Sequence, residues 1–340
     1  MADILPFIVT LTAGNDVVPQ GMPVDTLVVA PGTLNAGDDI QMTIGGRTMQ
    51  LTAAGTYDLT APRNLSGLQT IQGSTGDDAL VVSQERLAGV THIDLGGGLN
   101  VVQIAGAGGM DFSALTIENA TIRGRASVDN IIGTQGSDRI VTAGGTSDFV
   151  DGNAGRDTVI PDVFFSQFNA AAPNPAELLV AGTRVFDANG ERLYLRNVER
   201  VELRDGIVLL DQGANGAEAY RMVHAAFGTT PLEGTILSLR ESLDNGVPRE
   251  ALMSALMQSL PFERAYGNVQ SDAAFVDALY RVVLHRAADD GGRAVQLDAL
   301  AHGMSRASML VAFADTAEHV AVVGRAGTDG QLFVAEVGIA

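Results

Sequence analysis

The chain lacks several residue types on which many enzymes and binding proteins depend. Its 340 residues include no cysteine and no tryptophan, and all 21 basic residues are arginine because no lysine occurs. The absence of cysteine excludes disulfides, thiol catalysis and thiolate metal sites, and it is typical of bacterial proteins that work outside the cell. The absence of lysine excludes a Schiff-base lysine and a P-loop lysine.

Long apolar runs and excess positive charge are also missing. No apolar run reaches the roughly 18 residues of a transmembrane helix, so membrane insertion is not expected. The opening residues, MADILPFIVTLTAGND, have no basic region, so no cleaved N-terminal signal is expected. The formal net charge of −19 argues against a nucleic-acid partner, because phosphate binding requires a basic surface. An acidic surface keeps a protein soluble and can be condensed by divalent cations.

Signatures of common enzyme classes are not found either. The five histidines have neither HExxH nor His-x-His spacing, so no zinc site is predicted, and no Gly-x-Ser-x-Gly elbow occurs. A β-helix can use a carboxylate pair to cleave glycans, and Asp77 with Asp78 or Asp148 with Asp151 are the candidates. Adjacent strand residues point to opposite faces, which disfavours Asp77 with Asp78. We therefore predict that the chain is not an enzyme.

The most informative stretch is residues 133–160, GTQGSDRIVTAGGTSDFVDGNAGRDTVI. Three aspartates there each precede an apolar β-former by two residues, and they lie ten and nine residues apart. This spacing is close to the nonapeptide GGxGxDxUx of a calcium-binding β-roll. Stacked coils align their Gly-rich turns, so that carboxylates and turn carbonyls form an oxygen cage suited to Ca²⁺. The predicted calcium ligands are Asp138, Asp148, Asp151, Asn153 and Asp157.

Weaker copies of the same sequence motif occur earlier in the chain. Residues 14–16, 76–78 and 98–100 read Gly-Asn-Asp, Gly-Asp-Asp and Gly-Leu-Asn, and each precedes an apolar β-former. They add Asp16 and Asp78 to the predicted ligands. Ordinary turns explain these isolated copies as well, since Asn and Asp tolerate the left-handed conformation and hydrogen-bond their own backbone.

Turn signals recur about every ten residues through residues 1–160, between short runs rich in Val, Ile, Thr and Leu. This pattern favours a β-solenoid or β-roll-like region, in which each strand buries an inward residue and Gly or Asn occupies the corners. A sandwich followed by a short roll is the alternative. Residues 161–212 predict a β-rich connector that contains an Ala/Pro-rich loop.

Residues 213–325 predict an all-α helical-repeat domain. Apolar positions at i, i+3, i+4 and i+7 mark six helices, over 217–227, 232–244, 249–260, 272–284, 293–301 and 305–319. A constant shift along the chain places Phe227 on Leu284, Gly246 on Gly303 and Arg249 on Arg306, which indicates a duplicated three-helix unit. The apolar, acidic tail 326–340 is interpreted either as a secretion signal or as an edge strand.

Two segments of this domain carry a recognisable repeat. Residues 279–292, LYRVVLHRAADDGG, and 300–307, LAHGMSRA, fit the shape "LY…vLgRapDagG…L..G.sra", and 195–211 precede the first copy. They resemble a helical-repeat family of unknown function found in secreted bacterial RTX-type and S-layer-like proteins. The first copy departs from it, with TTPLE at 229–233 in place of Arg-x-x-Asp. The resemblance implies export by type I secretion and an extracellular or cell-surface location.

These features predict an extracellular structural protein, such as a subunit of a surface layer or particle coat, that is ordered by Ca²⁺ and self-associates. The alternative is a glycan-binding adhesin, or a spike of a phage-like particle, that recognises host surface polysaccharide. The lack of tryptophan and the five tyrosines leave few platforms on which sugars could stack. A polysaccharide-cleaving β-helix enzyme is the least favoured option.

Overall fold

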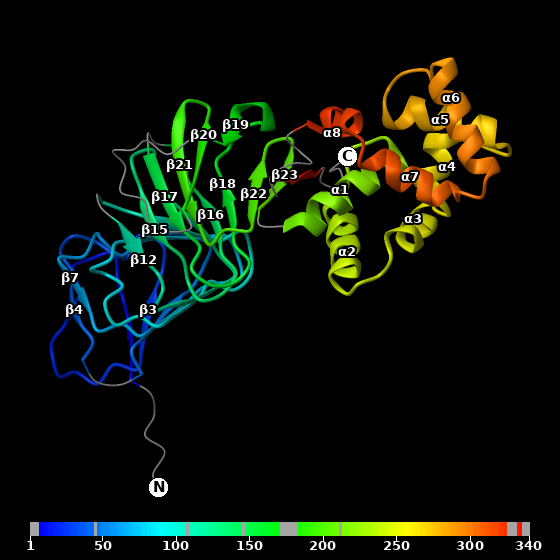
Figure 1. Ribbon diagram of the computed structural model, residues 1–340. Helices are drawn as coiled ribbons and strands as arrows, with labels where there is room; N and C mark the ends of the chain where they lie inside the picture. Colours follow the sequence, from blue (N-terminus) through cyan, green and yellow to red (C-terminus); the bar gives the residue numbers. More distant parts are fainter. Residues whose placement is uncertain are drawn as a thin grey trace, which may run out of the picture. The chain divides into compact units, whose positions relative to one another are not determined.

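The computed structural model describes residues 7–43, 46–106, 109–144, 147–170, 183–210, 213–324 and 332–334 (Figure 1). The chain forms two compact units, Met1–Arg204 and Asp205–Ala340. Residues from about 8 to 210 form a β-solenoid of about seven turns, and eight helices follow in the described part of residues 213–324. The predicted fold class is therefore confirmed.

Four sheets form the walls of the solenoid unit, and strands of successive coils pair in parallel within each sheet. The first sheet contains β1 (Ile8–Thr10), β3 (Thr26–Val29), β5 (Thr48–Leu51), β8 (Thr70–Gln72), β10 (His92–Asp94) and β13 (Thr116–Glu118). The second contains β6 (Gly55–Asp58), β9 (Asp78–Val82), β11 (Val101–Ile104), β14 (Thr121–Arg123), β16 (Arg139–Val141), β18 (Thr158–Ile160) and β22 (Arg200–Leu203). The third contains β12 (Met110–Asp111), β15 (Asn130–Ile132), β17 (Ser147–Asp151), β21 (Glu191–Arg196), β20 (Arg184–Ala188) and β19 (Phe168–Ala170), and the fourth contains β2 (Val17–Val18), β4 (Asp39–Gln41) and β7 (Asn64–Ser66).

The coils of the N-terminal half have a regular length, and hydrogen bonds join residues that are 22 positions apart on neighbouring coils. Thr26 pairs with Thr48, Thr48 with Thr70 and Thr70 with His92, each one coil further along the chain. The next residue of each strand points inward, and Leu27, Met49, Ile71 and Ile93 are all fully buried. One inward apolar residue per strand thus stacks on its equivalents in the neighbouring coils, which forms the core of the solenoid.

The coils over residues 130–160 are shorter and contain two strands each. Strands β15, β16, β17 and β18 alternate between the third and second sheets, so β15 pairs with β17 and β16 with β18. Ile140 pairs with Val159, and the backbone of Asp138 likewise meets Asp157, 19 positions further along. Two strands per coil account for the nine- to ten-residue spacing of the aspartates.

Antiparallel strands follow the last coils. Strands β20 and β21 form a hairpin whose turn, Asn189-Gly190, has positive φ at both residues, as a type I′ turn requires. Phe168 stacks on Phe186 in the same sheet, with ring centroids 4.5 Å apart. A short 3₁₀ helix, Phe165–Gln167, precedes β19. Most of the expected Ala/Pro-rich loop lies outside the described residues.

The helical unit contains α1 (Gly213–Phe227), α2 (Glu233–Asp244), α3 (Arg249–Met257), α4 (Leu260–Tyr266), α5 (Asp272–Val283), α6 (Asp290–Ala301), α7 (Arg306–Ala314) and α8 (Ala317–Val323). The predicted helix 305–319 is divided into α7 and α8, whereas the helix predicted over 249–260 ends at Met257 and is followed by α4, which was not predicted as a separate helix. The side chains of Ser259 and Thr316 accept the backbone N–H of Phe262 and His319, which starts α4 and α8 as separate helices.

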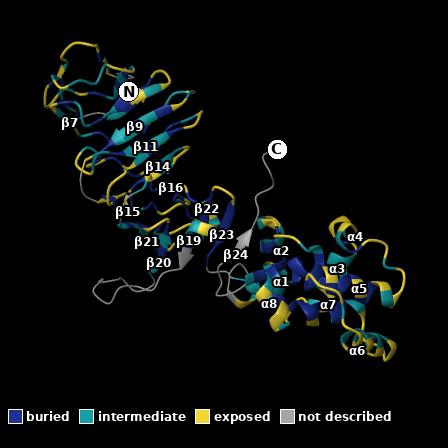
Figure 2. Ribbon diagram, turned by 90° about the horizontal axis from the view of Figure 1, so that it is seen from above, coloured by how far each residue is buried: buried dark blue, intermediate teal, exposed yellow. Residues whose placement is uncertain are grey.

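The helices repeat at a constant interval along the chain. Helices α2, α3 and α4 begin at 233, 249 and 260, and α6, α7 and α8 begin at 290, 306 and 317. Buried side chains concentrate along α1, α5 and α7 (Figure 2). Within the C-terminal tail, Leu332–Val334 form β24, which pairs antiparallel with β23 (Gly206–Leu209), and the rest of the tail lies outside the described residues.

Candidate functional site

The aspartates of the solenoid turns fold back over the turns that precede them. In residues 133–138, Asp138 Oδ2 accepts the Thr134 backbone N–H at 2.6 Å, and Asp138 Oδ1 accepts the Thr134 hydroxyl at 3.0 Å. The same backbone contact, four residues back, joins Asp16 to Thr12 at 2.8 Å and Asp78 to Ser74 at 2.7 Å. The aspartate therefore satisfies the backbone of its own turn through a local bond from its side chain to the N–H four residues back.

A glycine five residues before the aspartate makes room for this contact. A Cβ atom on Gly133 would lie 2.5 Å from Asp138 Oδ2, and one on Gly152 would lie 2.4 Å from Asp157 Oδ2. These distances are too short for any side chain. The glycines of the repeated motif therefore allow a carboxylate to approach the backbone closely, in addition to permitting the turn.

Several of these acidic side chains also connect two coils, because an oxygen accepts a backbone N–H from the coil before it. Asp157 Oδ1 accepts the N–H of Asp138 at 2.8 Å, and Glu199 Oε2 accepts the N–H of Asp157 at 2.8 Å. On the other side of the same coils, Asp148 Oδ1 accepts the N–H of Asp129 at 2.9 Å. Acidic side chains thus form columns along the solenoid.

The column of Asp138, Asp157 and Glu199 contains an unusual oxygen. Asp157 is fully buried, and its Oδ2 has no hydrogen-bond partner among the described residues. The N–H expected to satisfy it, that of Asn153, instead donates to Asp151 Oδ1 at 3.1 Å, in a turn where Asn153 has φ 73°. A buried ionised oxygen without a donor is costly, so this position is suited to a proton or a cation.

Burial shifts the pKa values of the turn carboxyls in the same sense. It raises the pKa of Asp157 to about 7, with further contributions from the negative charges of Asp138, Glu199 and Asp151. Burial also raises the pKa of Asp148 to about 6, and Asp129 and Glu191 add to that effect. The pKa of Asp138 is raised by burial as well.

The seven predicted ligands do not converge on one point. Asp138 and Asp157 lie in adjacent coils of one column, and Asp151 and Asn153 belong to the turn that leads to Asp157. Asp151 also accepts Arg196 Nη1 at 3.1 Å and Asn197 Nδ2 at 2.7 Å. The three remaining residues lie in other turns: Asp148 in the neighbouring column, and Asp16 and Asp78 in earlier coils.

A hard cation fits the turn of Asp157 in part. Ca²⁺ takes six to eight oxygen ligands, and in the described part of the chain the Asp157 Oδ2 atom has no competing donor. Both oxygens of Asp138 already accept hydrogen bonds, so they could serve a cation only through their second lone pairs. Sequence reasoning missed Asp129 and Glu199 as members of the columns, although Gly124 stands five residues before Asp129 as in the other turns.

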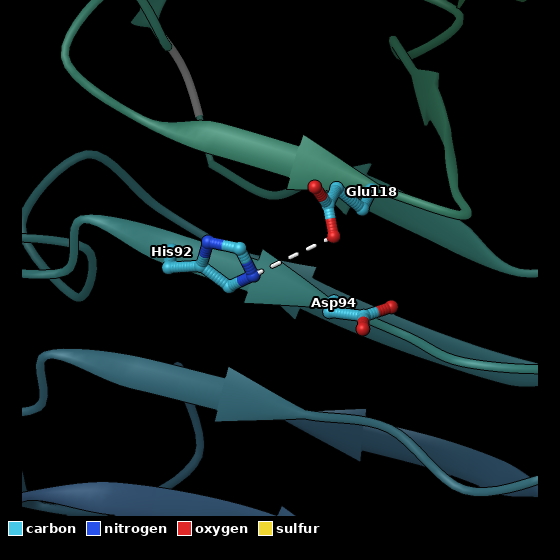
Figure 3. Close-up of side chains that lie close together, drawn as sticks. All are labelled: His92, Asp94 and Glu118. Carbon is cyan, nitrogen blue, oxygen red and sulfur yellow. Dashed lines mark ion pairs between the residues drawn. The ribbon is translucent and has the colours of Figure 1, made fainter.

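Sequence reasoning also missed a cluster on the outer face of the first sheet. His92 and Asp94 of β10 and Glu118 of β13 lie side by side there (Figure 3). Their spacing in the sequence matches no short zinc motif. The signal that could have found them is the coil length, because a residue one coil further along lies on the adjacent strand.

The helical unit explains the Arg-x-x-Asp motif structurally. Arg286 forms an ion pair with Glu318, and Asp289 caps α6 by accepting the N–H of Gly292 at 2.8 Å. In the first copy, the three equivalent positions hold Thr229, Leu232 and Pro261, which can make neither contact.

Three of the scattered histidines also meet in the helical unit. The His224 Nδ1 and His319 Nε2 atoms lie 3.1 Å apart, and the His285 ring centroid lies 6.3 Å from that of His224. Sequence reasoning did not place them together, because each belongs to a different helix or helix end.

Comparisons with known proteins identify one part of the chain. Residues 253–323 match the family model of a domain of unknown function, DUF4214, which here extends from within α3 to the end of α8. No curated protein and no solved structure matches the chain. Among the described residues, no helix has the length and apolar character needed to cross a membrane.

Proposed function

We propose that the protein is an extracellular structural protein, a subunit of a cell-surface layer or particle coat, whose solenoid is ordered by calcium. The observation that carries the proposal is the buried Asp157 Oδ2, which has no hydrogen-bond donor among the described residues and lies in a column of acidic side chains. A bound cation would neutralise this column and join successive coils. Its binding would therefore stabilise several coils of the solenoid, whereas a cation bound to a single surface turn would stabilise only that turn.

The β-roll arrangement of residues 130–160 supports the calcium part of this proposal. Turns 133–138 and 152–157 stack directly, since the backbone of Asp138 donates to the side chain of Asp157. Turn carbonyls and carboxylates of two coils are thereby brought together, and such oxygens are the ligands that Ca²⁺ prefers. Asp138, Asp151, Asn153 and Asp157 would contribute to this site.

We infer that the helical unit contains two copies of the same domain. The DUF4214 match covers residues 253–323, and the helix starts at 290, 306 and 317 repeat those at 233, 249 and 260. The first copy has lost the Arg-x-x-Asp contacts. Together with the resemblance to RTX-type and S-layer-like proteins, this favours export by type I secretion and a role of the helical unit in self-association or attachment.

A calcium titration of chelator-treated protein tests the proposal. Far-UV circular dichroism and thermal unfolding should show added β-structure or higher stability as calcium reaches millimolar concentrations, the range of many extracellular sites. Asp157→Asn should abolish most of this response. Asp187→Asn is the matched control, because Asp187 accepts a turn N–H, that of Gly190 at 2.8 Å, in the hairpin of β20 and β21 and contacts none of the column carboxylates in the described residues.

Two outcomes would contradict the calcium role. One is a wild-type protein whose spectrum and melting temperature do not change with calcium. The other is an equal response from wild type and Asp157→Asn, which would place the effect elsewhere on the acidic surface. In both cases the turn aspartates would act only through their hydrogen bonds to the backbone.

A surface groove favours glycan binding as the second candidate function. The groove has a volume of about 500 Å³ on the outer side of the second sheet, and Leu99, Thr121, Arg123 and Arg139 are among its lining residues. Leu99 is 85% exposed. In the described part of the chain, the guanidinium of Arg123 has no ion pair, so it could meet an acidic sugar.

Retention on acidic cell-surface polysaccharides tests this second function. Binding should weaken in Arg123→Gln and persist in Arg63→Gln, a control that removes an exposed arginine paired with Asp39 on another coil. Failure of the wild-type protein to bind across a panel of acidic and neutral glycans would exclude it. A cleaving enzyme receives less support, because strand alternation places Asp148 and Asp151 of β17 on opposite faces.

A further inference from the structure

His92, Asp94 and Glu118 bring three metal-binding groups together on the outer face of the first sheet. His92 and Asp94 are two residues apart on β10, so both side chains point outward, and Glu118 on β13 lies directly opposite Asp94 in the parallel register. One nitrogen of His92 and one oxygen from each carboxylate all lie within 4.8 Å of one another. His92 Nε2 and Glu118 Oε2 are 3.8 Å apart, and the dashed line in Figure 3 marks this pair.

The earlier coils carry uncharged residues at the equivalent places on this face. The positions that stack on His92 are Thr26, Thr48 and Thr70, and those that stack on Asp94 include Gln50 and Gln72. Threonine and glutamine suit a solvated strand face and have no charge. Ionisable side chains therefore replace threonine and glutamine at these stacked positions only on β10 and β13, the two strands that carry His92, Asp94 and Glu118.

Asp94 is held in place and Glu118 is free to adjust. Asp94 Oδ1 accepts the Asn119 Nδ2–H at 2.8 Å and the Gly96 N–H at 2.9 Å, which leaves Oδ2 available to an ion. The side chain of Glu118 is 53% exposed and makes no hydrogen bond to the described residues. A fixed carboxylate beside an adjustable one suits a site that closes around an ion.

The two carboxylates are not neutralised by arginine. Like charges directly opposite on neighbouring strands repel each other, and in the described residues the one ion pair that either carboxylate makes is that of Glu118 with His92. Arginines elsewhere in the solenoid pair with Asp39, Asp129, Asp151, Asp162 and Glu202. A cation bound between Asp94 and Glu118 would remove this repulsion.

We propose that His92, Asp94 and Glu118 form a binding site for zinc or another first-row divalent transition metal. The imidazole nitrogen selects such ions over Ca²⁺ and Mg²⁺, which prefer oxygen ligands. Bond lengths of about 2.0–2.2 Å require ligand atoms about 3.3 Å apart, so side chains whose ligand atoms lie up to 4.8 Å apart would close by as much as about 1.5 Å around the ion. Three protein ligands leave a fourth position open to water.

This site is separate from the proposed calcium column in both position and chemistry. Its residues lie on β10 and β13, whereas Asp138, Asp157 and Glu199 adjoin β16, β18 and β22. Zinc binding is therefore measured on the chelator-treated full chain in millimolar calcium, so that the acidic columns are occupied first. If the zinc site is disproved, the calcium proposal is unaffected, and the reverse also holds.

Isothermal titration with zinc chloride and visible absorption of the Co²⁺ complex test the proposal. Wild type should bind one zinc ion per chain in a step that calcium does not displace. His92→Gln and Asp94→Asn should each weaken this step by about tenfold or more. His302→Gln is the matched control, because exposed His302 lies 3.4 Å from Asp298 outside any three-ligand cluster of the described residues, and it should bind like wild type.

The spectrum of bound Co²⁺ separates a built site from loose binding to surface carboxylates. Intense d–d bands that disappear in His92→Gln support the site. The proposal is overturned if the wild-type protein shows no binding step of one zinc ion per chain. It is also overturned if His92→Gln and Asp94→Asn bind zinc with the same affinity as wild type. Unchanged thermal unfolding of metal-free Asp94→Asn, in which the amide still accepts the Gly96 N–H, shows that any loss is not a folding defect.

Discussion

Glycine and aspartate act as a pair in the turns of this solenoid. The glycine provides space against the backbone, and the aspartate five residues later fills it with a carboxylate oxygen. The sequence motif could be recognised from its spacing. The hydrogen bonds that join it to the neighbouring coil could not be recognised, because those partners lie 19 positions away along the chain.

Replacing Gly152 by alanine tests this pairing. The new Cβ would lie 2.2 Å from Asn197 O and 2.4 Å from Asp157 Oδ2, so the turn must shift, and we expect a loss of about 2 kcal/mol or more in the free energy of unfolding. Gly136→Ala is the control, since its nearest atom, Thr134 Oγ1, is 3.6 Å away. Urea unfolding of both variants provides the measurement, and equal losses would refute the space argument.

The pKa of Asp157 leads to a specific pH dependence. It is raised from 3.8 to about 7, so between these values the folded chain holds a proton that the unfolded chain has released. In chelator, the stability of the solenoid should therefore fall as pH rises from about 4 to 7, by at most about 1.4 kcal/mol per pH unit for this group. Calcium should oppose the loss, because the ionised carboxylate binds it.

Asp157→Asn should flatten this part of the profile, because the amide does not titrate. Denaturant unfolding between about pH 3.5 and 8, a range that brackets the rise of this pKa from 3.8 to about 7, provides the profile, with Asp187→Asn as control. An unchanged slope in Asp157→Asn would show that another buried carboxyl, such as Asp148 with its pKa of about 6, dominates.

At the scale of the element, helix caps decided what local periodicity could not. The apolar pattern of 305–319 continues across Asp315 and Thr316, so one helix was predicted where α7 and α8 are separate. The Thr316 side chain accepts the His319 N–H at 3.1 Å and starts the second helix. The periodicity of apolar residues indicates which face of a helix is buried. Where one helix ends and the next begins in a new direction depends instead on a cap hydrogen bond.

Thr316→Ala should lower the stability of the helical unit by about 1 kcal/mol, since the first turn of α8 loses its cap. Thr235→Ala is the comparison, because Thr235 lies inside α2, where alanine is a better helix former. Thermal unfolding followed by helical circular dichroism distinguishes them. A cap that contributes nothing would leave both variants alike.

The buried histidine pair links α1 to α8. His319 Nδ1 lies 2.8 Å from the Ala314 carbonyl oxygen and must donate to it, so His319 Nε2 accepts the hydrogen of His224 Nδ1. Burial, with His319 and His285 nearby, lowers the pKa of His224 to about 4, and burial lowers the pKa of His319. Arg221 and Asp315 lie close to His319 with opposing effects on its pKa.

Acid should therefore destabilise the helical unit. Between pH 6.5 and about 4 the unfolded chain binds protons that the buried pair does not, so stability present at neutral pH is lost as pH falls. His224→Gln should reduce this acid sensitivity, whereas His302→Gln, on an exposed helix end, should not. Chemical unfolding at neutral and acidic pH decides, and identical acid sensitivity in His224→Gln and wild type would exclude the pair.

At the scale of the whole molecule, the fold class was predictable and the coil length was not. Short strands between turns and the periodicity of the apolar residues after residue 213 are local signals. The longer period of the first coils involves Thr26, Thr48, Thr70 and His92, whose neighbours differ from coil to coil. For that reason the cluster of His92, Asp94 and Glu118 could not be predicted from the sequence, whereas the nine- to ten-residue spacing of the aspartates in 133–160 could be recognised.

The net charge of −19 opposes assembly of many copies into a lattice, because like-charged surfaces repel over roughly a Debye length of 10 Å at 0.1 M salt. A structural subunit needs a counterion that binds rather than one that only screens. Light scattering should therefore show larger particles in millimolar calcium than in sodium chloride of equal ionic strength, and chelator should reverse the growth. Asp157→Asn should assemble less than Asp187→Asn at the same calcium concentration. If sodium chloride produced the same particles, screening alone would explain assembly, and the acidic columns would have no part in it.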